Sequence, residues 1–227
     1  KAGVKKQIKW NKKAYEKLTQ HIGKLPVVFI SPYDGDLIAE GSELRRKWMD
    51  GILSQLDKTY LDEIQRYYRL LEQRHALLRN MHEHRLFDAD AIEVWDAQLI
   101  PSGNYIHAQR KNFLAEFIPV FKRFSEQIGQ NSEEVEISYR SQLLEDKFEN
   151  LLLASSKKDL LTQYTNTGIH KDDLIFTIKG HPIKKFGSQG QQKSFVIALR
   201  LSQFDWLKHH KGQKPVLLLD DIFDKLD

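Results

Sequence analysis

The sequence contains no cysteine. Disulfide bonds and thiolate metal sites are therefore excluded, and the absence agrees with a reducing compartment such as the cytoplasm. No apolar run approaches the length of a membrane span and no signal peptide is visible, so we expect no membrane partner.

A phosphate-binding loop of the form Gly-x-x-x-x-Gly-Lys-Ser/Thr is also missing. The only Gly-Lys pair is Gly23-Lys24, which has Leu18 at the earlier glycine position and Leu25 at the hydroxyl position. The chain thus lacks the lysine and the backbone cradle that hold nucleotide phosphates. We expect that it does not bind ATP tightly by itself.

The composition is that of a folded chain of one or two lobes. Of the 227 residues, 41% are hydrophobic and 29% are charged. The net charge of +4 and the pI of about 9.0 favour anionic partners mildly, but they are too small to establish DNA binding.

Residues 1–35 are expected to belong to a nucleotide-binding lobe. A short helix is predicted over 12–22, and the apolar run Val27–Ile30 predicts a strand. Lysines interleaved with two aromatic residues precede this strand: Lys5, Lys6, Lys9, Lys12, Lys13 and Lys17, with Trp10 and Tyr15. A phosphate-contacting patch has this composition, but on the residues alone a solvated helix face is the better explanation.

Residues 36–130 are expected to form a helical lobe. Two segments show apolar residues every seven positions, as in a coiled coil. The first seam contains Leu61, Tyr68, His75 and His82, interleaved with Ile64, Leu71 and Leu78, and the second contains Ile92, Leu99, Ile106, Phe113 and Val120. The break near 87–90 is short, which predicts antiparallel helices. Pro101 and Pro119 are expected to kink or divide the second helix.

Residues 131–227 are expected to return to the nucleotide-binding lobe. Alternating polar and apolar residues predict a strand over 133–140, a helix is predicted over 142–165, and a second strand over 174–178.

The last forty residues carry the strongest functional signal. The apolar run 216–219 predicts a strand of a parallel sheet, and such sheets bind ligands at the carboxyl ends of their strands. Asp220 is at that end, where a carboxylate can hold Mg²⁺, and Asp221 could orient or deprotonate a water molecule. A solvated turn after a core strand would explain the Asp-Asp pair about as well.

The loop upstream adds a second element. Gly187 and Gly190 flank Ser188, so backbone N–H groups can approach an anion, and Ser188 can cap the helix that follows. Alone, this would be an ordinary capped helix. Together with an Asp-Asp strand, with Ser188 and Asp220 32 positions apart, it becomes a more specific signal.

These segments resemble the RecF family of ABC/SMC-type ATPases, bacterial proteins of DNA replication and repair. Residues 186–194 resemble the family's signature loop, 216–221 its Walker B strand and 222–227 its D-loop. Residues 168–174 are similar to a Gly-Pro-His-Arg-Asp-Asp-Leu block, and 31–57 to the segment that leads into the helical lobe. The resemblance implies an α/β fold, α+β within this fragment: part of an ABC-ATPase sheet lobe plus a largely helical lobe with antiparallel coiled-coil-like helices.

The resemblance also implies roles for individual residues. The signature loop would contact the γ-phosphate of an ATP held by a partner subunit, through Ser188, Gln189, Gly190 and Gln191. Asp220 would hold Mg²⁺, Asp221 would be the catalytic carboxylate, and Asp227 would lie at the dimer seam. Since most ABC ATPases have Glu at the position of Asp221, slow hydrolysis is implied.

The implied function is ATP-gated DNA binding in recombinational repair and replication, linked to the SOS response. An ATP-dependent homodimer would bind duplex DNA or single/double-strand junctions and act with recombination-mediator proteins. Because ABC-type chains carry the phosphate loop near their start, we interpret the sequence as an internal fragment of a longer protein, unlikely to hydrolyse ATP alone. The alternatives are a non-catalytic helical protein-interaction module or a fragment of another SMC-like ATPase.

Other clusters are weaker candidates. Arg45, Arg46 and Lys47 lie at the root of the helical lobe and could contact DNA, although a helix-surface role is at least as good an explanation. His170, with Asp172 and Asp173, is interpreted as a structural or signalling element near the nucleotide. The His82-Glu83-His84 run is not expected to bind a metal, since helix positions two apart face different directions.

Overall fold

The computed structural model describes residues 8–86, 88–129 and 134–220. Its α-helices are α1 (Asp36–Ala39), α2 (Ser42–Leu56), α3 (Lys58–His84), α4 (Ala89–Ile128), α5 (Phe148–Thr162), α6 (Ile183–Phe186) and α7 (Gln189–Lys211). Its strands are β1 (Lys9–Trp10), β2 (Lys13–Ala14), β3 (Val27–Ile30), β4 (Val135–Arg140), β5 (Asp173–Ile178), β6 (His181–Pro182) and β7 (Val216–Leu219). Short 3-10 helices are η1 (Leu18–His21), η2 (Pro32–Gly35), η3 (Gln142–Leu144) and η4 (Ile169–Lys171).

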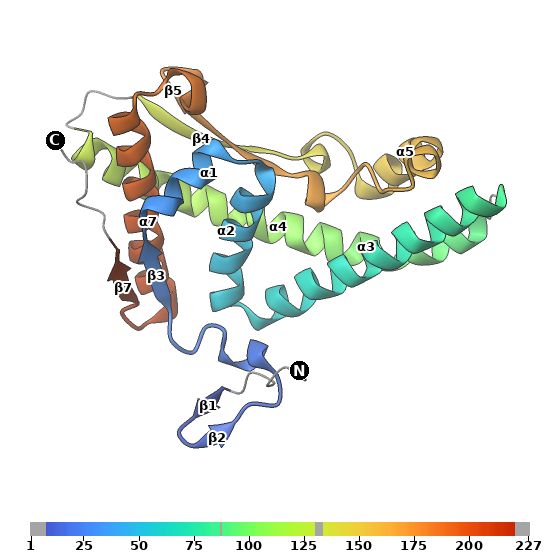
Figure 1. The fold of residues 1–227 in the computed structure, drawn as a ribbon, viewed down its shortest axis with the longest axis horizontal. Helices are drawn as coiled ribbons and strands as arrows, with labels where there is room; N and C mark the ends of the chain where they lie inside the picture. Colours follow the sequence, from blue (N-terminus) through green and yellow to red (C-terminus); the bar gives the residue numbers. More distant parts are fainter. Residues whose placement is uncertain (1–7, 87, 130–133, 221–227) are drawn as a thin grey trace, which may run out of the picture.

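The expected α+β architecture is confirmed. In Figure 1, α3 and α4 form a long helical pair that extends from a body containing α2, α7 and the strands, and the β1–β2 hairpin lies below this body. Across the three described ranges, no helix has the length and apolarity of a membrane span.

The parallel pair β3–β7 forms the part of a sheet that the two apolar runs predict. Ile30 pairs with Leu219 at its end, so the residues that follow the two strands lie at one carboxyl edge. Val28 and Ile30 are buried on the face where α7 packs. The pair is not buried on both faces, as strands inside a parallel sheet usually are: Leu218 is 48% exposed and its partner Phe29 45%.

The second sheet is antiparallel, in the order β4-β5-β6. Its strands β4 and β5 confirm the two strands predicted after the helical lobe. The helix predicted over 142–165 is shorter than expected: η3 occupies its start and α5 begins only at Phe148.

The antiparallel pair α3–α4 confirms the coiled-coil prediction. Most apolar seam positions of both helices are buried, among them Leu71, Leu99 and Ile106. Of the two effects expected of proline, division of the second helix does not occur, because α4 continues through Pro101 and Pro119. Its neighbours hold it there: α4 packs against α3, α5 and α7.

The two seam histidines differ from expectation. His75 and His82 face the segment after α5, where His75 Nε2 accepts a hydrogen bond from the N–H of Thr165 (3.0 Å) and His82 Nδ1 lies 3.2 Å from Gln163 Nε2. No group of three or more His, Asp or Glu side chains among the described residues could hold a metal ion.

The helix predicted over 12–22 is also wrong. The segment begins instead as a hairpin, whose turn residues Asn11 and Lys12 have φ of 48° and 67°. Two successive left-handed residues form the tight turn that matches the twist of a hairpin, and Asn tolerates this conformation well. Only Leu18–His21 is helical, as a 3-10 turn.

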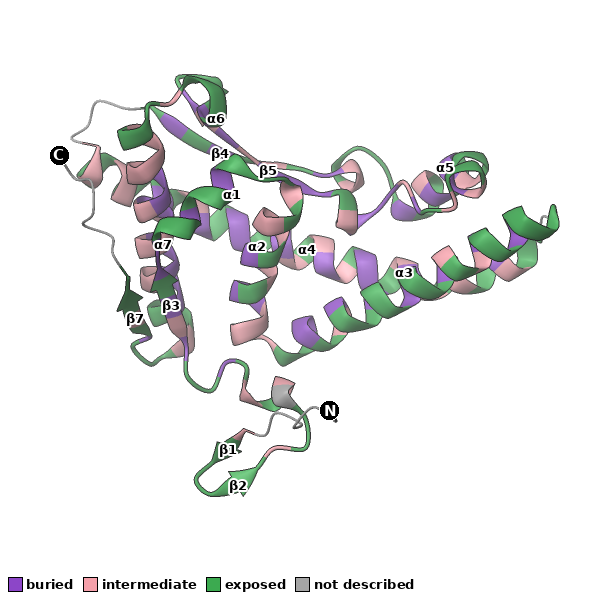
Figure 2. Cartoon of the chain, in the orientation of Figure 1, coloured by how far each residue is buried: buried purple, intermediate pink, exposed green. Residues whose placement is uncertain are grey.

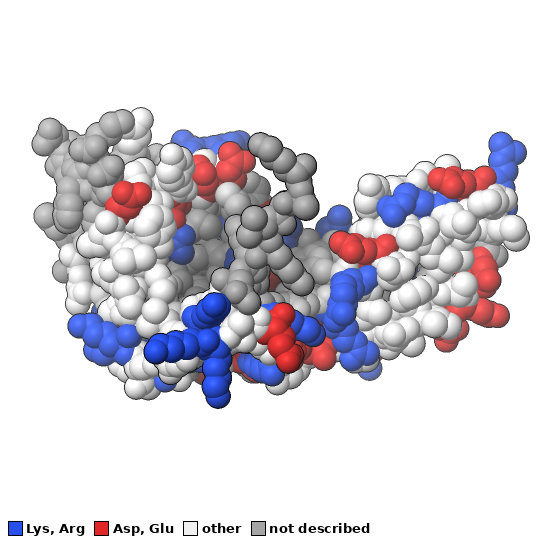
Figure 3. Space-filling view, turned by 60° about the horizontal axis from the view of Figure 1, so that its bottom comes forward, with Lys and Arg blue, Asp and Glu red and all other residues white. Residues whose placement is uncertain are grey.

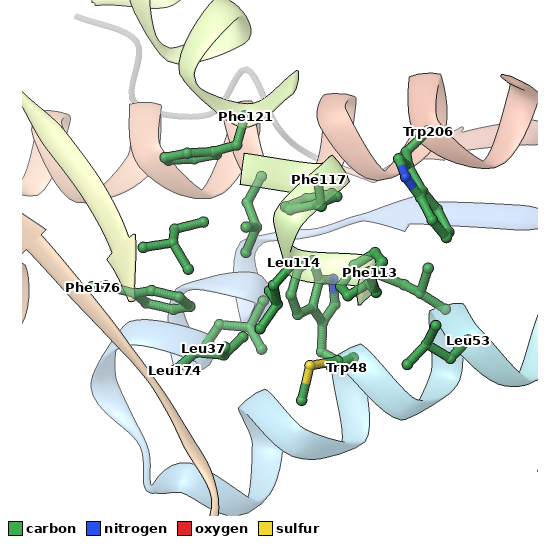
Figure 4. Packing of buried hydrophobic residues seen from close by; sticks show 14 of the residues in the cluster. Leu37, Trp48, Leu53, Phe113, Leu114, Phe117, Phe121, Leu174, Phe176 and Trp206 are labelled. Carbon is green, nitrogen blue, oxygen red and sulfur yellow. The ribbon is translucent and has the colours of Figure 1, made fainter. Parts of the chain in front are cut away.

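An aromatic core fixes the direction of α7. Trp48 of α2, Phe113 and Phe117 of α4, and Trp206 of α7 converge in Figure 4. Edge-on contacts join Trp48 to Phe117 (5.4 Å between ring centroids) and Phe113 to Trp206 (4.7 Å). Each such pair contributes about 0.5–1.5 kcal/mol beyond its buried area. Figure 2 shows that this side of α7 is buried while the loop before it is exposed.

Candidate functional site

The Gly-Ser-Gln-Gly loop opens α7 through a reciprocal cap. Ser188 Oγ accepts the N–H of Gln191 (3.2 Å), and Gln191 Oε1 accepts the N–H of Ser188 (2.7 Å). The N–H groups of Gln189 and Gly190 come before the first intrahelical hydrogen bond, at an exposed helix end. This end offers N–H donors and the positive pole of the helix dipole to an anion.

The two glycines of the loop have different reasons to be glycine. A Cβ on Gly187 would lie 2.8 Å from both Cγ1 and the carbonyl oxygen of Ile183, so local packing requires glycine there. A Cβ on Gly190 would meet only Ser188 Oγ, at 3.9 Å, and the backbone there is helical. Packing within the described residues therefore does not explain Gly190.

Asp220 lies at the carboxyl edge of the parallel pair, as the sequence predicts. Its N–H donates to the carbonyl of Ile30 (2.9 Å), and its side chain is exposed. The neighbouring strand runs into η2, where the carboxylate of Asp34 accepts the N–H of Ser31 (3.0 Å). Arg200 of α7 donates to the other oxygen of Asp34 (2.6 Å). Asp221 and Asp227 lie outside the described residues.

The structure does not bring the loop and Asp220 together. The contact between Arg200 and Asp34 places the carboxyl edge of β3–β7 level with Arg200, which follows Ser188 by 12 positions. With 1.5 Å of rise per helical residue, Ser188 lies about 18 Å farther along the helix. Figure 1 agrees, because β7 ends roughly midway along α7. One phosphate group cannot touch both ends within one chain.

The basic run at the start of α2 is partly internal. Arg45 forms an ion pair with Asp173 (2.7 Å), and Arg46 donates a hydrogen bond to the carbonyl of Asp172 (2.6 Å). Lys47 lies at the surface in an exposed ion pair within its own helix. Arg45 and Arg46 therefore join α2 to β5, and DNA contact by these three residues stays a prediction.

Arg110 is a buried residue that sequence reasoning missed. Its fully buried guanidinium donates to the carboxylates of Asp50 (2.9 Å) and Asp172 (2.8 Å) and to the carbonyl of Ile169 (2.7 Å). Burial opposes its positive charge, but the carboxylates of Asp50 and Asp172 raise the pKa of Arg110 well above its usual value. The cluster thus joins α2 and α4 to the segment that enters β5.

His170 belongs to the same polar core. Its Nε2 lies 2.9 Å from the carbonyl oxygen of Thr165, so Nε2 carries the proton, and its Nδ1 accepts from the hydroxyl of Tyr67 (2.9 Å). Burial lowers the pKa of His170 to about 3, with a further contribution from Lys171. A neutral, fully hydrogen-bonded His170 supports the structural interpretation of the 168–174 block.

A second buried arginine lies farther along the helical pair. Arg74 of α3 donates to Asp96 (2.6 Å) of α4, to Asp159 (2.7 Å) of α5 and to the hydroxyl of Thr165 (2.9 Å). A signal for such residues was present, because Arg74 stands three positions after Leu71 and Arg110 three positions before Phe113, the spacing at which a heptad places its second core residue.

Comparisons with known proteins cover the whole chain. No family model matches the chain. The "DNA replication and repair protein RecF" of Flavobacterium johnsoniae is 52% identical over 227 residues, all of this chain and 63% of that protein. The protein of the same name from Phocaeicola vulgatus is 46% identical over 98% of this chain and 60% of its own length. The chain therefore spans about three fifths of these relatives.

The solved structures that resemble this chain are also structures of RecF. The structure of "the recombination mediator protein RecF-ATPrS in RecFOR pathway" has a TM-score of 0.90 and 31% identity over all of this chain and 63% of that one. The corresponding RecF-ATP structure has a TM-score of 0.89 and 32% identity over 97% of this chain and 61% of that one.

Proposed function

Because this chain belongs to the RecF family, we propose that the whole protein is an ATP-dependent DNA-binding protein of recombinational DNA repair and replication in the cytoplasm. Two subunits close around two ATP molecules, and closure forms a surface that binds duplex DNA or single/double-strand junctions. The protein then acts with recombination-mediator proteins to load a recombinase at gaps.

The separation of Ser188 from the β7 edge supports a composite site. With the loop about 18 Å along α7 from the level of Asp34, the exposed N–H groups of Gln189 and Gly190 are free to serve a nucleotide held by another subunit. Gly190 fits this role, since a close approach by a phosphate group explains a glycine that internal packing does not require.

The β7 edge supplies the second half of the site. Mg²⁺ on a nucleotide needs only one or two protein carboxylates beside the phosphate oxygens, so the single exposed carboxylate of Asp220 fits it. The ion neutralises phosphate charge when it is bound. Asp221 orients the attacking water, and Asp227 lies at the seam between the subunits.

A positive charge introduced at position 188 tests whether the loop contacts the ATP of a partner subunit. In the whole protein, we expect Ser188→Arg to abolish ATP-dependent dimerisation, measured by light scattering with ATP and Mg²⁺, while the monomer stays folded and loses only the about 0.5–2 kcal/mol that the helix cap contributes. The matched control is Gln73→Arg, which adds the same charge at an exposed position of α3. Normal dimerisation of Ser188→Arg would remove the loop from the ATP site.

Asp221→Asn tests the catalytic role separately. The substitution keeps the size of the side chain but removes the negative charge and one acceptor oxygen, so we expect slower ATP hydrolysis with unchanged ATP affinity. Unchanged turnover would exclude Asp221 as the catalytic carboxylate.

A second function, as a protein-interaction module, is favoured by one surface. Leu153, Leu161 and Tyr164 on or just after α5 are 79%, 74% and 55% exposed. If this surface binds a recombination-mediator protein, Leu153→Glu weakens binding of the purified mediator and leaves ATP-dependent dimerisation intact. Equal binding by the variant would reject this second function.

The division into functional parts belongs to the same proposal. Residues 1–35 and 131–227 contribute to the ATPase lobe, and residues 36–130 form the helical lobe. Arg45, Arg46 and Lys47 stand where these parts meet, and the internal contacts of Arg45 and Arg46 support a role in holding the two lobes together.

A further inference from the structure

We propose that the β1–β2 hairpin and the cleft behind it form a contact surface for the phosphate backbone of duplex DNA. This inference rests on the proposed DNA-binding function and assigns it to residues outside the loop and the β7 edge. The surface is defined by five lysines, Lys9, Lys12, Lys13, Lys17 and Lys24, together with Lys58 at the start of α3.

Charge is concentrated on this segment. Between residues 8 and 24 the chain has five lysines and a single acidic residue, Glu16. All five lysines are exposed, and none of them forms an ion pair with any residue that the structure describes. By contrast, the guanidinium groups of Arg45, Arg74 and Arg110 are engaged in internal ion pairs.

The hairpin holds its lysines away from the body. Each strand has only two residues, and the tight turn puts Lys12 at the tip. Register pairs Trp10 with Lys13 on one face and Lys9 with Ala14 on the other, so lysines project from both faces and from the tip. Figure 2 shows the hairpin as exposed throughout.

An aromatic cluster anchors the hairpin at its base. A two-stranded hairpin is marginally stable alone, and here the imidazole of His21 contacts both Trp10 and Tyr15, each with 5.7 Å between ring centroids. Lys24 Nζ lies 4.9 Å from the centre of the Tyr15 ring. Trp10 still has 39% of its surface exposed, and it can pack against sugars of a bound strand.

The cleft extends the positive surface to the helices. It has a volume of about 560 Å³ and lies between the hairpin segment, the α2–α3 junction and the end of α7. Lys24, Lys58 and Lys211 line it, and Asp62 is its one acidic lining residue. Figure 3, which brings the lower side of Figure 1 forward, shows blue side chains gathered over this region.

The chemistry favours a phosphate backbone over base recognition. Lysine is a flexible point charge, which attracts phosphates without reading sequence. The fork of an arginine, which reads guanine edges, is absent between residues 8 and 24. Binding at this surface is therefore independent of sequence and strongly dependent on salt.

Charge reversal at the tip tests the proposal. In the whole protein with ATP and Mg²⁺, we expect Lys12→Glu/Lys13→Glu to lower affinity for a fluorescein-labelled 30-base-pair duplex at least tenfold near 0.1 M salt. Losing two phosphate contacts makes the negative slope of log affinity against log salt less steep by about 1.8. A second variant, Lys9→Gln/Lys17→Gln, removes charge without reversing it and gives a smaller loss.

The control is Lys157→Glu/Lys158→Glu, an exposed lysine pair on α5 that makes the same change in net charge. It leaves affinity and slope within twofold of the unaltered protein. Equal duplex affinity and equal salt slope for the tip variant and the control overturn the proposed DNA-contact surface. The same result overturns it when the tip variant has instead lost the binding of an acidic protein segment. If the unaltered protein dimerises with ATP but binds no duplex, the proposed DNA-binding function fails, not merely its location.

Discussion

Substituting alanine for each of the two loop glycines separates a packing role from a ligand role. Both positions have negative φ, Gly187 as extended backbone and Gly190 within the first turn of α7, so alanine introduces no backbone strain at either. The two substitutions therefore differ in what the new methyl group meets, and this difference predicts opposite effects on stability.

Gly187→Ala places its Cβ 2.8 Å from Ile183 Cγ1 and from the carbonyl oxygen of Ile183. A backbone oxygen cannot rotate away, so α6 must shift, and overpacking of this kind costs about 1–3 kcal/mol. Gly190→Ala meets only Ser188 Oγ at 3.9 Å. It restricts the unfolded chain and favours the helix, which stabilises the protein by about 0.5–1 kcal/mol.

Urea unfolding of the two variants measures the stability difference, and light scattering with ATP and Mg²⁺ measures assembly. We expect Gly190→Ala to unfold at higher urea and yet to lose ATP-dependent dimerisation, because its methyl group occupies the space that a phosphate group needs. A variant that is more stable but fails to assemble cannot be explained by misfolding. Normal assembly of Gly190→Ala, or a loss of stability, would refute the assignment.

Three further predictions concern the buried polar groups. Arg110→Met leaves two carboxylates without their cation and should cost about 3–5 kcal/mol in urea unfolding at pH 7; adding Asp172→Asn to that variant should restore part of the loss. Burial keeps His170 neutral, with a pKa of about 3 against about 6.5 when unfolded, so stability should fall as the pH drops below about 6.5. His170→Gln should remove up to about 2 kcal/mol of that loss at pH 5, and equal pH profiles would contradict it. Arg200→Met should lower the unfolding free energy by about 1–3 kcal/mol by leaving the buried carboxylate of Asp34 unpaired, and circular dichroism melts would detect it.

Local sequence patterns predicted much of the fold, because interactions between residues close in sequence produce those patterns. The heptad seams located α3 and α4, the apolar runs located β3 and β7, and Ser188 predicted the cap of α7. The hairpin was missed because lysine-rich sequence has helical propensity, while the decisive feature was two left-handed residues at Asn11 and Lys12.

The buried ion pairs could not be predicted in the same way. Arg110 is 60 positions from Asp50 and 62 from Asp172, and no local pattern says which carboxylates a buried arginine will meet. What the sequence did contain was an anomaly, a charge among apolar seam positions. Such a charge must find a partner, since an isolated buried ion is too costly. Such a charge indicates where a buried polar network lies but does not identify the residues that form it.

The position of Arg200 links the two halves of the proposed site. At one end α7 carries the loop that would serve a partner's nucleotide, and about 18 Å along it Arg200 holds Asp34, which caps the turn after β3 beside Asp220. A single rigid helix, fixed by Trp206 in the aromatic core, therefore sets the distance between a subunit's own nucleotide edge and its neighbour's. Any rotation of α7 when the subunits close must move both half-sites together, or break the Arg200–Asp34 pair. A Cys pair replacing Arg200 and Asp34, joined by a bis-methanethiosulfonate cross-linker about as long as an arginine side chain, would distinguish these cases. If closure preserves the contact, the cross-linked protein still dimerises with ATP, whereas loss of dimerisation that returns on reduction would show that closure requires the pair to separate.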